Sequence, residues 1–342
     1  MKAIVFEEHG SLENLKFMDV PEPEIKRNEV LIKLSASALN HLDLFVLKGW
    51  KGLTLKFPHI CGADGGGKIV EVGEGVDSFK VGDEVVINPG ISCMRCSFCL
   101  KGEHSLCKEF GILGEHFNGT FAEYISVPFY NIEKAPEHLT KEERASFPLT
   151  FLTSYRMVFS KGKIKVGDFI LIHGGSSGVS IASLIFSKIA GCITIVTSSK
   201  DEALLKLKEM GADFIINYKN ENVFKRVMEI TNGEGVDFVL DSVGKETWAT
   251  SLKAVKKGGT ILTCGATSGP NPEEEIRLIF WKQINIFGST MSSISEFKEM
   301  VNLVKEKKLK PVIDSIYPLE EAKLAYKKLE EGKQFGKIVL KI

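Results

Sequence analysis

Four of the seven cysteines, Cys93, Cys96, Cys99 and Cys107, lie close together in a C-x2-C-x2-C-x7-C pattern. Gaps of two residues let successive thiolates turn toward one ion, and the longer last segment can loop back to complete a tetrahedron. Because four thiolates leave no open coordination position, the pattern predicts one structural zinc ion per subunit. The alternatives are free thiols or an iron–sulfur cluster. Ferredoxin-like runs, however, close with a gap of three residues and a proline, where this chain has a gap of seven and Lys108.

A second candidate site is the turn that follows the apolar run FILIH. The chain continues as GGSSGVS and then becomes helix-like, so a buried strand leads through a turn to a helix N-terminus. The positions of a G-x-G-x-x-G motif fall on Gly175, Ser177 and Ser180, and Gly178 and Val179 complete the turn. Serine is small enough to let a pyrophosphate approach the helix N-terminus. The turn therefore predicts a dinucleotide site, and a tight turn without a ligand is the alternative.

The strand after this turn ends in IVTSSK and presents Ser198, Ser199 and Lys200. Sites that prefer NAD usually have Asp or Glu at this point, where the carboxylate binds the ribose 2′-hydroxyl. Two hydroxyls and one ammonium suit a 2′-phosphate instead. The sequence therefore favours NADP(H), with NAD(H) possible. The alternative for Lys200 is a solvated residue in a loop that enters a helix.

The elements that must position these groups change character along the chain. Up to about residue 135, short strand-like runs are separated by Gly, Pro and Asp: KAIVF, EVLIKLSA, GKIVEVG, DEVVIN and FAEYISV. Strands at this spacing predict a small, mostly antiparallel β domain. A helix near 139–160 is expected to link it to the following part, and the last fifty residues are expected to add two helices and a strand.

From about residue 165, continuous apolar strands alternate with amphipathic helices. The helices are predicted at 179–190, from Asp201 as N-cap to Gly211 as C′ residue, near 221–231 and near 245–256. Apolar strands of this kind are covered by helices on both faces. The alternation is typical of a doubly wound parallel sheet, so the predicted fold class is α/β.

The net charge and the lengths of the apolar runs indicate which classes of binding partner and which cell compartment to expect. The 342 residues hold 44 Lys and Arg and 44 Asp and Glu, so the net charge is zero and favours neither nucleic acid nor an anionic membrane as a partner. No run approaches the roughly 18 apolar residues of a membrane span, and the first apolar run is too short for a signal-peptide core. A cytoplasmic protein is expected, in which clustered cysteines favour metal over disulfides.

Together these features resemble the medium-chain dehydrogenase/reductase superfamily, which holds zinc alcohol dehydrogenases and quinone reductases. The resemblance covers essentially the whole chain. It rests on LNHLDLFVLKG, PHICGADGGGKIVEVGEGVDSFKVGDEVV, the cysteine lobe, GTFAEY, PLTFLTSYRMV, the strand and glycine turn, and FGKIVLKI. It implies a GroES-like, mostly β catalytic domain (1–150 and 290–342, with the zinc lobe at 90–110) and a Rossmann domain (151–289), with the active site in the cleft between them. It also implies a homodimer or homotetramer that pairs through the edge strand near INIFGS.

The chain differs from the family's zinc alcohol dehydrogenases at the three residues that bind their catalytic zinc. The family's Cys, His and Cys ligands fall on Asn40, Ala63 and Leu149. In this respect the site is similar to zinc-free quinone and enone reductases, which carry Asn-x-x-Asp and G-x-D in the same places. Asn40, His41, Asp43 and Asp64 are therefore the candidate catalytic residues, in which Asp43 orders the site.

One alternative keeps a catalytic metal. A rearranged zinc site could draw on His41, Asp64 and His116, or on His59. His41 could instead contact the cofactor pyrophosphate, as Arg or His does at its family position, and His59 and His116 could be packed or solvated loop residues.

Further cofactor contacts are implied only by the resemblance. Thr153 would lie near the nicotinamide, and Tyr218 at the 2′-phosphate. Gly265 and Ala266 would pass the nicotinamide ribose, and Ile286 and Phe287 would flank the carboxamide. Lys337 would be the basic residue at the pyrophosphate. For the apolar members, plain core packing is the alternative.

The leading functional hypothesis is NADPH-dependent reduction of an α,β-unsaturated carbonyl or a quinone. Charge that develops on the substrate oxygen would be met by backbone N–H groups, the Asn40 amide or His41. The alternative is a zinc-dependent alcohol dehydrogenase or aldehyde reductase that uses the rearranged ligands. A third hypothesis, from another class, is a protein that binds NADPH without useful turnover.

Overall fold

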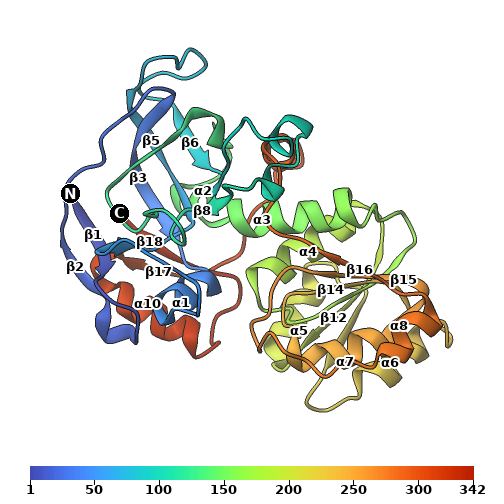
Figure 1. Ribbon diagram of the computed structural model, residues 1–342. Helices are drawn as coiled ribbons and strands as arrows, with labels where there is room; N and C mark the ends of the chain where they lie inside the picture. Colours follow the sequence, from blue (N-terminus) through green and yellow to red (C-terminus); the bar gives the residue numbers. More distant parts are fainter. The chain divides into compact units, whose positions relative to one another are not determined.

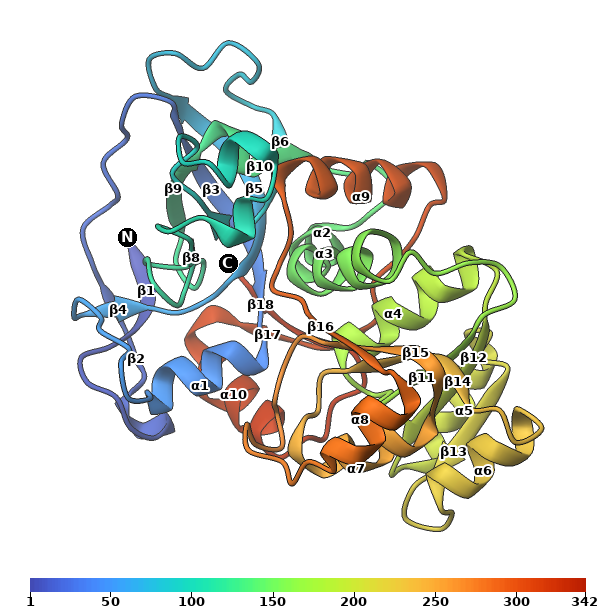
Figure 2. The same cartoon turned by 45° about the vertical axis from the view of Figure 1, so that its right-hand side comes forward.

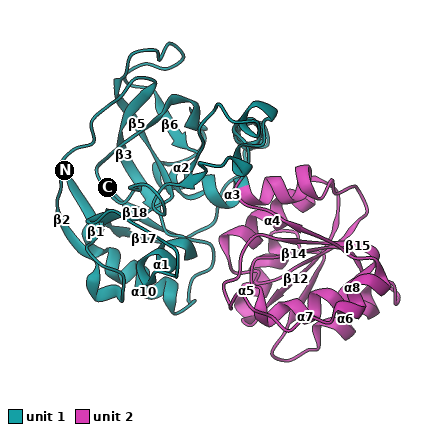
Figure 3. Cartoon of the chain, viewed as in Figure 1, with its two compact units in different colours: residues 1–152, 292–342 teal, residues 153–291 magenta.

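The computed structural model describes residues 1–342 as two compact units, Met1–Leu152 with Ser292–Ile342 (unit 1) and Thr153–Met291 (unit 2) (Figure 3). The sequence prediction places the divisions after residues 150 and 289. None of the helices combines the length and the apolar character that crossing a lipid bilayer requires.

Unit 1 is built mainly from antiparallel strands. They are β1 (Lys2–Phe6), β2 (Lys16–Asp19), β3 (Glu29–Ala38), β4 (His59–Ile60), β5 (Asp64–Val72), β6 (Glu84–Ile87), β7 (Gly90–Ile91), β8 (Gly111–Ile112), β9 (Tyr124–Pro128), β10 (Ile132–Lys134), β17 (Ile313–Pro318) and β18 (Lys337–Lys341). The largest sheet has the order β10-β6-β5-β3-β18-β17, and β9 also pairs with β3. The C-terminal strand β18 thus lies against the N-terminal strand β3, although β17 is a strand that the sequence prediction missed.

Five helices accompany these strands: α1 (His41–Lys48), α2 (Lys141–Ser146), α3 (Pro148–Tyr155), α9 (Ile294–Glu306) and α10 (Ala322–Glu330). The two expected C-terminal helices are therefore present. Helices α1 and α10 lie side by side (Figure 2). An apolar core beneath them includes the fully buried rings of Phe6, Phe121 and Tyr326.

Unit 2 is a six-stranded parallel sheet with helices on its faces (Figure 1). Its strands are β11 (Phe169–Ile172), β12 (Ile193–Ser198), β13 (Phe214–Asn217), β14 (Val236–Asp241), β15 (Val255–Thr263) and β16 (Asn285–Gly288). Its helices are α4 (Gly178–Ile189), α5 (Asp201–Glu209), α6 (Val223–Ile230), α7 (Lys245–Ala254) and α8 (Ile276–Lys282). The strand order β13-β12-β11-β14-β15-β16 reverses next to β11, which is the doubly wound order in which ligands bind outside the carboxyl ends of the strands.

The expected single helix near 139–160 is wrong. The chain forms α2, then α3, and then a π-helical segment Arg156–Lys161. Pro148 explains the break, because proline has no N–H group to continue the hydrogen bonding of α2. Pro148 instead starts α3, a position at which its missing donor costs nothing.

Asp201 is the first residue of α5 and not its N-cap, which is Lys200. Its carboxylate accepts a hydrogen bond from Asn217 Nδ2 at 2.6 Å, so it is directed to the neighbouring strand end and not to the helix backbone. Gly211 does follow the C-cap and has φ of +99°, which is the predicted C′ geometry.

Candidate functional site

The four lobe cysteines converge in unit 1. Their sulfur atoms all lie within 4.8 Å of one another, and Sγ of Cys99 is 4.0 Å from that of Cys93 and 3.6 Å from that of Cys96. A tetrahedral Zn–S₄ site with bonds of about 2.3 Å requires S···S distances of roughly 3.8 Å. The predicted cluster is therefore formed, and its geometry fits zinc.

Backbone groups prepare the sulfurs to bind as thiolates. The N–H groups of Cys93 and Glu109 donate to Cys107 Sγ at 3.4 and 3.3 Å. A hydrogen bond from the backbone of Cys99 lowers the pKa of Cys96 to about 6, although burial raises that of Cys99. Donors aimed at sulfur stabilise the charged form that a metal requires.

Sheet register brings three other candidate residues together in unit 1. Ala38 at the end of β3 pairs with Asp64 on β5 and with Val339 on β18. Asn40 lies two residues beyond Ala38, and Lys337 lies two residues before Val339 on an antiparallel strand. Their side chains therefore meet at the same end of the sheet.

Asn40, Asp64 and Lys337 form a buried cluster. Lys337 Nζ donates to Asn40 Oδ1 at 2.6 Å and to Asp64 Oδ2 at 2.8 Å. Asn40 Nδ2 donates to Asp64 Oδ2 at 3.0 Å and to the carbonyl oxygen of Ala38 at 3.3 Å, and the N–H of Leu149 donates to Asp64 Oδ1 at 2.7 Å. The side chains of Lys337 and Asp64 are 5 % and 0 % exposed, so this is an ion pair almost removed from solvent.

This geometry shows how Asn40 and Lys337 are paired within the protein. Both N–H groups of the Asn40 amide are already used, so Asn40 orients its neighbours and is not an open donor. Lys337, for which the resemblance implies a contact with the cofactor pyrophosphate, donates from its ammonium to Asn40 and Asp64 within the protein. The physical reason is that an unpaired buried carboxylate is costly, and Lys337 is the cation that the sheet register places beside it.

Asp43 holds the start of α1, as the sequence predicts for a residue that orders the site. Its two carboxylate oxygens accept hydrogen bonds from the N–H groups of Asn40 at 2.7 Å and Gly62 at 3.0 Å. Burial raises the pKa of Asp43 to about 7, and these two hydrogen bonds act in the opposite direction.

Asp43→Asn tests this carboxyl through pH. The pKa of Asp43 is higher in the folded chain than its ordinary value of 3.8, so protonation of this carboxyl stabilises the fold. This stabilisation is fully present below pH 3.8 and is lost as the pH rises through about 7. The stability advantage of wild type over the variant should therefore fall between about pH 4 and 7, by a few kcal/mol at most. Thermal melts of both proteins across this range measure it, and a constant difference would show that the carboxyl does not titrate there.

The structure does not gather the ligands of a rearranged zinc site. Among His, Cys, Asp and Glu residues, the four lobe cysteines are the only group of three or more whose ligand atoms lie close together. His116 Nδ1 accepts from the N–H of Ile112, and His59 Nε2 lies 3.1 Å from the carbonyl oxygen of Gly114. His41 is partly exposed, and burial together with Lys337 lowers its pKa, which favours the neutral ring.

The glycine turn of unit 2 has the form that the sequence predicts. A Cβ on Gly175 would come within 2.5 Å of Leu207 Cδ1 and 2.7 Å of Val196 Cγ1, so a larger residue would displace these side chains. Ser177 is the N-cap of α4 and accepts from the N–H of Ser180 at 3.1 Å. The hydroxyl of Ser180 donates to the carbonyl oxygen of His173 at 2.7 Å, which explains serine in place of the usual glycine. The N–H groups at the start of α4 are thus presented at the carboxyl end of β11, as an anion requires.

The residues expected near a 2′-phosphate lie at adjacent strand ends. Ser198 on β12 pairs with Asn217 on β13, and the N–H of Tyr218 donates to the carbonyl oxygen of Ser198 at 3.2 Å. The Ser198 hydroxyl is buried and accepts from the N–H of Lys200 at 3.3 Å, so it shapes the loop. Ser199 and Lys200 directly follow β12, and the half-exposed Tyr218 directly follows β13.

The remaining residues of unit 2 that were expected to contact the cofactor lie in different parts of the unit. Gly265 and Ala266 directly follow β15, at the same carboxyl edge of the sheet. Ile286 packs on the core of unit 2, Phe287 is 43 % exposed on the edge strand β16, and Thr153 is buried in α3.

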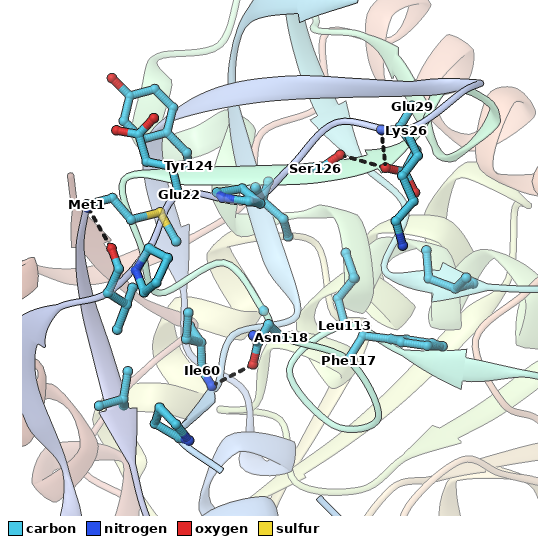
Figure 4. Close-up of a pocket in the computed structure, with 18 of the residues that line it drawn as sticks. Met1, Glu22, Lys26, Glu29, Ile60, Leu113, Phe117, Asn118, Tyr124 and Ser126 are labelled. Carbon is cyan, nitrogen blue, oxygen red and sulfur yellow. Dashed lines mark hydrogen bonds between the residues drawn. The ribbon is translucent and has the colours of Figure 1, made fainter. Parts of the chain in front are cut away.

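A groove of about 580 Å³ in unit 1 lies apart from all of these residues (Figure 4). Its polar groups bind one another: Asn118 Oδ1 accepts from the N–H of Ile60, and Glu29 Oε2 accepts from Ser126 Oγ. Because no polar groups converge there on a common point, the groove is not a candidate site.

The sequence did not indicate two of the donors to Asp64, the N–H of Leu149 and the ammonium of Lys337. The N–H of Leu149 is a backbone group, and no residue type signals its role. Lys337 carries a faint signal, since it is a charged residue at the start of the otherwise apolar run KIVL.

Comparisons with known proteins agree with the fold. Residues 26–137 match the model of the alcohol dehydrogenase GroES-like domain, and residues 178–306 match that of the zinc-binding dehydrogenases. A zinc-type alcohol dehydrogenase-like protein of Schizosaccharomyces pombe is 33% identical over 100% of this chain and 99% of its own length.

Two further proteins are similar over their whole length. An acryloyl-coenzyme A reductase of Sulfurisphaera tokodaii is 29% identical over 100% of both chains. The crystal structure of an NAD-dependent alcohol dehydrogenase superposes with a TM-score of 0.97 at 43% identity, again over 100% of both chains. The chain therefore belongs to the medium-chain dehydrogenase/reductase superfamily and is similar to its zinc-type alcohol dehydrogenase-like proteins, with a GroES-like and a Rossmann domain, and it is a dehydrogenase or reductase.

Proposed function

We propose that this protein is an NADP(H)-dependent reductase that transfers hydride to an α,β-unsaturated carbonyl compound or a quinone. The observation that carries the proposal is the buried cluster. Where the family's alcohol dehydrogenases bind catalytic zinc, this chain has Asn40, Ala63 and Leu149, and a lysine ammonium lies beside Asn40. These residues do not fit a zinc ion, because two of them offer no ligand atom and the third faces a cation.

Conjugated substrates suit such a site. A bound reduced nicotinamide would supply the hydride, and the protein's part is to orient the substrate and stabilise the charge that develops on its oxygen. In an enone or quinone that charge is delocalised, so hydrogen-bond donors can replace a Lewis acid. Similarity to an acryloyl-coenzyme A reductase, whose name denotes a conjugated acyl substrate, supports this class.

The cofactor proposed is NADP(H). Ser199, Lys200 and Tyr218 offer two hydroxyls and an ammonium where a 2′-phosphate would bind. Asp201, which directly follows Lys200, is bound by Asn217 and would not serve a ribose 2′-hydroxyl in this arrangement. The similar crystal structure of an NAD-dependent alcohol dehydrogenase makes the preference a point to test.

Lys200→Ala should raise the KM for NADPH about tenfold and leave the KM for NADH nearly unchanged, because a hydrogen bond to a charged phosphate contributes about 1.5–3 kcal/mol. Steady-state kinetics with both cofactors measure the ratio. Lys225→Ala, which removes an exposed lysine from α6, is the matched control. Equal effects on both cofactors would contradict the 2′-phosphate assignment.

The proposed function is tested by metal content together with a substrate panel. After exhaustive dialysis, plasma emission should find one zinc per subunit, held by the lobe cysteines. With NADPH, turnover should be fastest on enones and quinones. Tight NADPH binding without hydride transfer to any enone, quinone, ketone or aldehyde would instead support a binding protein.

A zinc-dependent alcohol dehydrogenase or aldehyde reductase is the second candidate. Its support is the similarity to alcohol dehydrogenases, up to 43% identity over the whole chain. Two zinc ions per subunit and alcohol oxidation that falls on replacement of His41 would favour it over the leading proposal.

Self-association through β16 is also proposed, in a cytoplasmic homodimer or homotetramer. β16 is the edge of the sheet, and Phe287 on it is 43 % exposed. On α8, Ile276, Phe280 and Trp281 are 64 %, 62 % and 74 % exposed. Covering an unpaired strand edge and apolar side chains favours association. Light scattering should give a dimer or tetramer mass, and Phe287→Lys should shift it toward the monomer.

A further inference from the structure

The glycine turn of unit 2 is held in place by residues outside the turn. Gly174 and Gly175 have no side chains, so neighbouring residues must fix the N–H groups that the turn presents. The N–H of Gly175 donates to the carbonyl oxygen of Thr197 at 2.7 Å, and the hydroxyl of Ser180 donates to the carbonyl oxygen of His173 at 2.7 Å. His173 directly follows β11 and leads into the turn. Its position therefore sets where the turn begins.

The ring of His173 lies at the centre of a buried chain of hydrogen bonds. His173 is 2 % exposed. Its Nδ1 lies 3.4 Å from the hydroxyl oxygen of Thr197, and its Nε2 lies 3.1 Å from that of Ser251. Ser251 in turn donates to Asp241 Oδ2 at 2.8 Å. The chain thus joins the carboxyl ends of β12, β11 and β14 with helix α7.

The partners of each group assign the hydrogen atoms of this chain. Ser251 directs its hydroxyl hydrogen to the carboxylate of Asp241, so its oxygen accepts from the Nε2–H group of His173. Nδ1 of His173 then accepts from the hydroxyl of Thr197. Burial lowers the pKa of His173, although Asp241 acts in the opposite direction. The neutral ring has the one donor and the one acceptor that the chain requires.

Asp241 anchors the far end of the chain. It is completely buried, and its Oδ1 accepts from the N–H groups of Val243 at 2.9 Å and Gly244 at 3.0 Å. The hydroxyl of Thr247 also donates to this carboxylate, at 2.8 Å from Oδ2. In a buried network whose members all have partners, a displacement at one end breaks hydrogen bonds at the other. The chain therefore resists movement of His173.

We propose that His173 is a positioning residue for the dinucleotide and holds the glycine turn where the N–H groups at the start of α4 meet the pyrophosphate. His173 acts through the turn and not by contact with the ligand. The inference rests on the proposed function, because it requires a dinucleotide at this turn. All members of the chain belong to unit 2.

The end of the site expected to bind the 2′-phosphate is held separately. Strand β12 pairs with β13 as far as Ser198 and Asn217, and these backbone contacts do not involve the ring of His173. Ser199 and Lys200 follow directly on β12. Loss of the ring should therefore weaken binding of the pyrophosphate and leave binding of the 2′-phosphate nearly unchanged.

Two ligands that differ in the pyrophosphate test this role. Adenosine 2′-monophosphate carries only the phosphate expected at Ser199 and Lys200, whereas 2′-phospho-ADP-ribose carries the pyrophosphate as well. Calorimetry gives the Kd of each ligand, and thermal melts give Tm, for wild type, His173→Phe and His173→Gln. Phenylalanine keeps a ring and loses both hydrogen bonds, whereas glutamine keeps an N–H group that can donate to Ser251.

The matched control is Thr231→Val. It removes a buried hydroxyl that accepts from the N–H of Gly235 at 2.9 Å, next to the amino end of β14 and so at the opposite end of the sheet from the turn. This control should lower Tm and leave the Kd of both ligands unchanged.

In His173→Phe, we expect the Kd for 2′-phospho-ADP-ribose to rise about tenfold and that for adenosine 2′-monophosphate to change less than about twofold. In His173→Gln, both values should stay within about threefold of wild type. Equal changes for the two ligands in His173→Phe would overturn the inference, because a general loosening of unit 2 affects the whole site. An unchanged Kd for 2′-phospho-ADP-ribose would overturn it as well.

A second variant decides the question if His173→Phe does not fold. Thr197→Val removes only the hydroxyl at Nδ1 of His173 and keeps the backbone carbonyl that accepts from Gly175. The Kd for 2′-phospho-ADP-ribose should rise about threefold, with no change for adenosine 2′-monophosphate. The same Kd as in wild type for both ligands would count against the inference.

Failure of the proposed function has a different signature. The measured quantity is binding, so it does not depend on which carbonyl compound is reduced. If wild type binds NADH and not NADPH, the proposed cofactor is wrong, and the Kd of ADP-ribose compared with that of adenosine decides the role of His173 in the same way.

Discussion

Lys337→Met alone is expected to destabilise the folded protein by about 3–5 kcal/mol, because it leaves the carboxylate of Asp64 buried without its cation. Asp64 is completely buried, and the remaining donors are the Asn40 amide and the N–H of Leu149. The penalty is therefore that of an uncompensated charge, and not only of one lost hydrogen bond.

Adding Asp64→Asn should recover most of this loss, since the double variant has no buried charge. Thermal or urea unfolding of wild type, both single variants and the double variant gives the interaction free energy directly. Lys328→Met is the control: its partner Asp314 is 14 % exposed and Lys328 itself 27 %, so its loss should be smaller. Additive single effects at positions 64 and 337 would show that the two charges do not depend on each other.

Cys96→Ser should abolish zinc binding by the lobe and lower stability by several kcal/mol, which corresponds to a fall in Tm of about 10 °C. The short segment Cys93–Cys107 has few elements that could hold it without the ion: two 3-10 turns, Cys99–Lys101 and His104–Leu106. The lobe also reaches the rest of unit 1, because the N–H of Ile294 at the start of α9 donates to His104 Nδ1 at 3.3 Å. Its loss should therefore loosen more than the loop itself.

The control for this variant is Cys264→Ala, outside the lobe. Burial raises the pKa of Cys264 to about 12, so its thiol stays protonated and does not act as a metal ligand. This variant should keep one zinc per subunit. Plasma emission and thermal melts measure both proteins, and the Kd for NADPH should be the same in each. A Cys96→Ser protein that keeps its Tm but loses activity would show that the lobe is not structural.

The sequence alone determined the features that depend on neighbours along the chain. The spacing of the lobe cysteines is short enough to fix how their thiolates converge, and the structure gathers them as predicted. The strand, glycine turn and helix around Gly175 are local as well, and so is the alternation of strands and helices that defines the doubly wound sheet. These patterns, together with the family motifs, were enough to give the fold and the enzyme class.

Only the tertiary structure decided the chemistry of the buried cluster. Lys337 and Asp64 are separated by 273 residues, and the register of β18 and β5 on either side of β3 brings them together. The carboxylate partner of Lys337 is set by this strand pairing, and the residue types near Lys337 in the sequence do not indicate it. The break at Pro148 and the bond between Asp201 and Asn217 show the same limit, because a backbone restriction and a neighbouring strand overrode what the local pattern favoured.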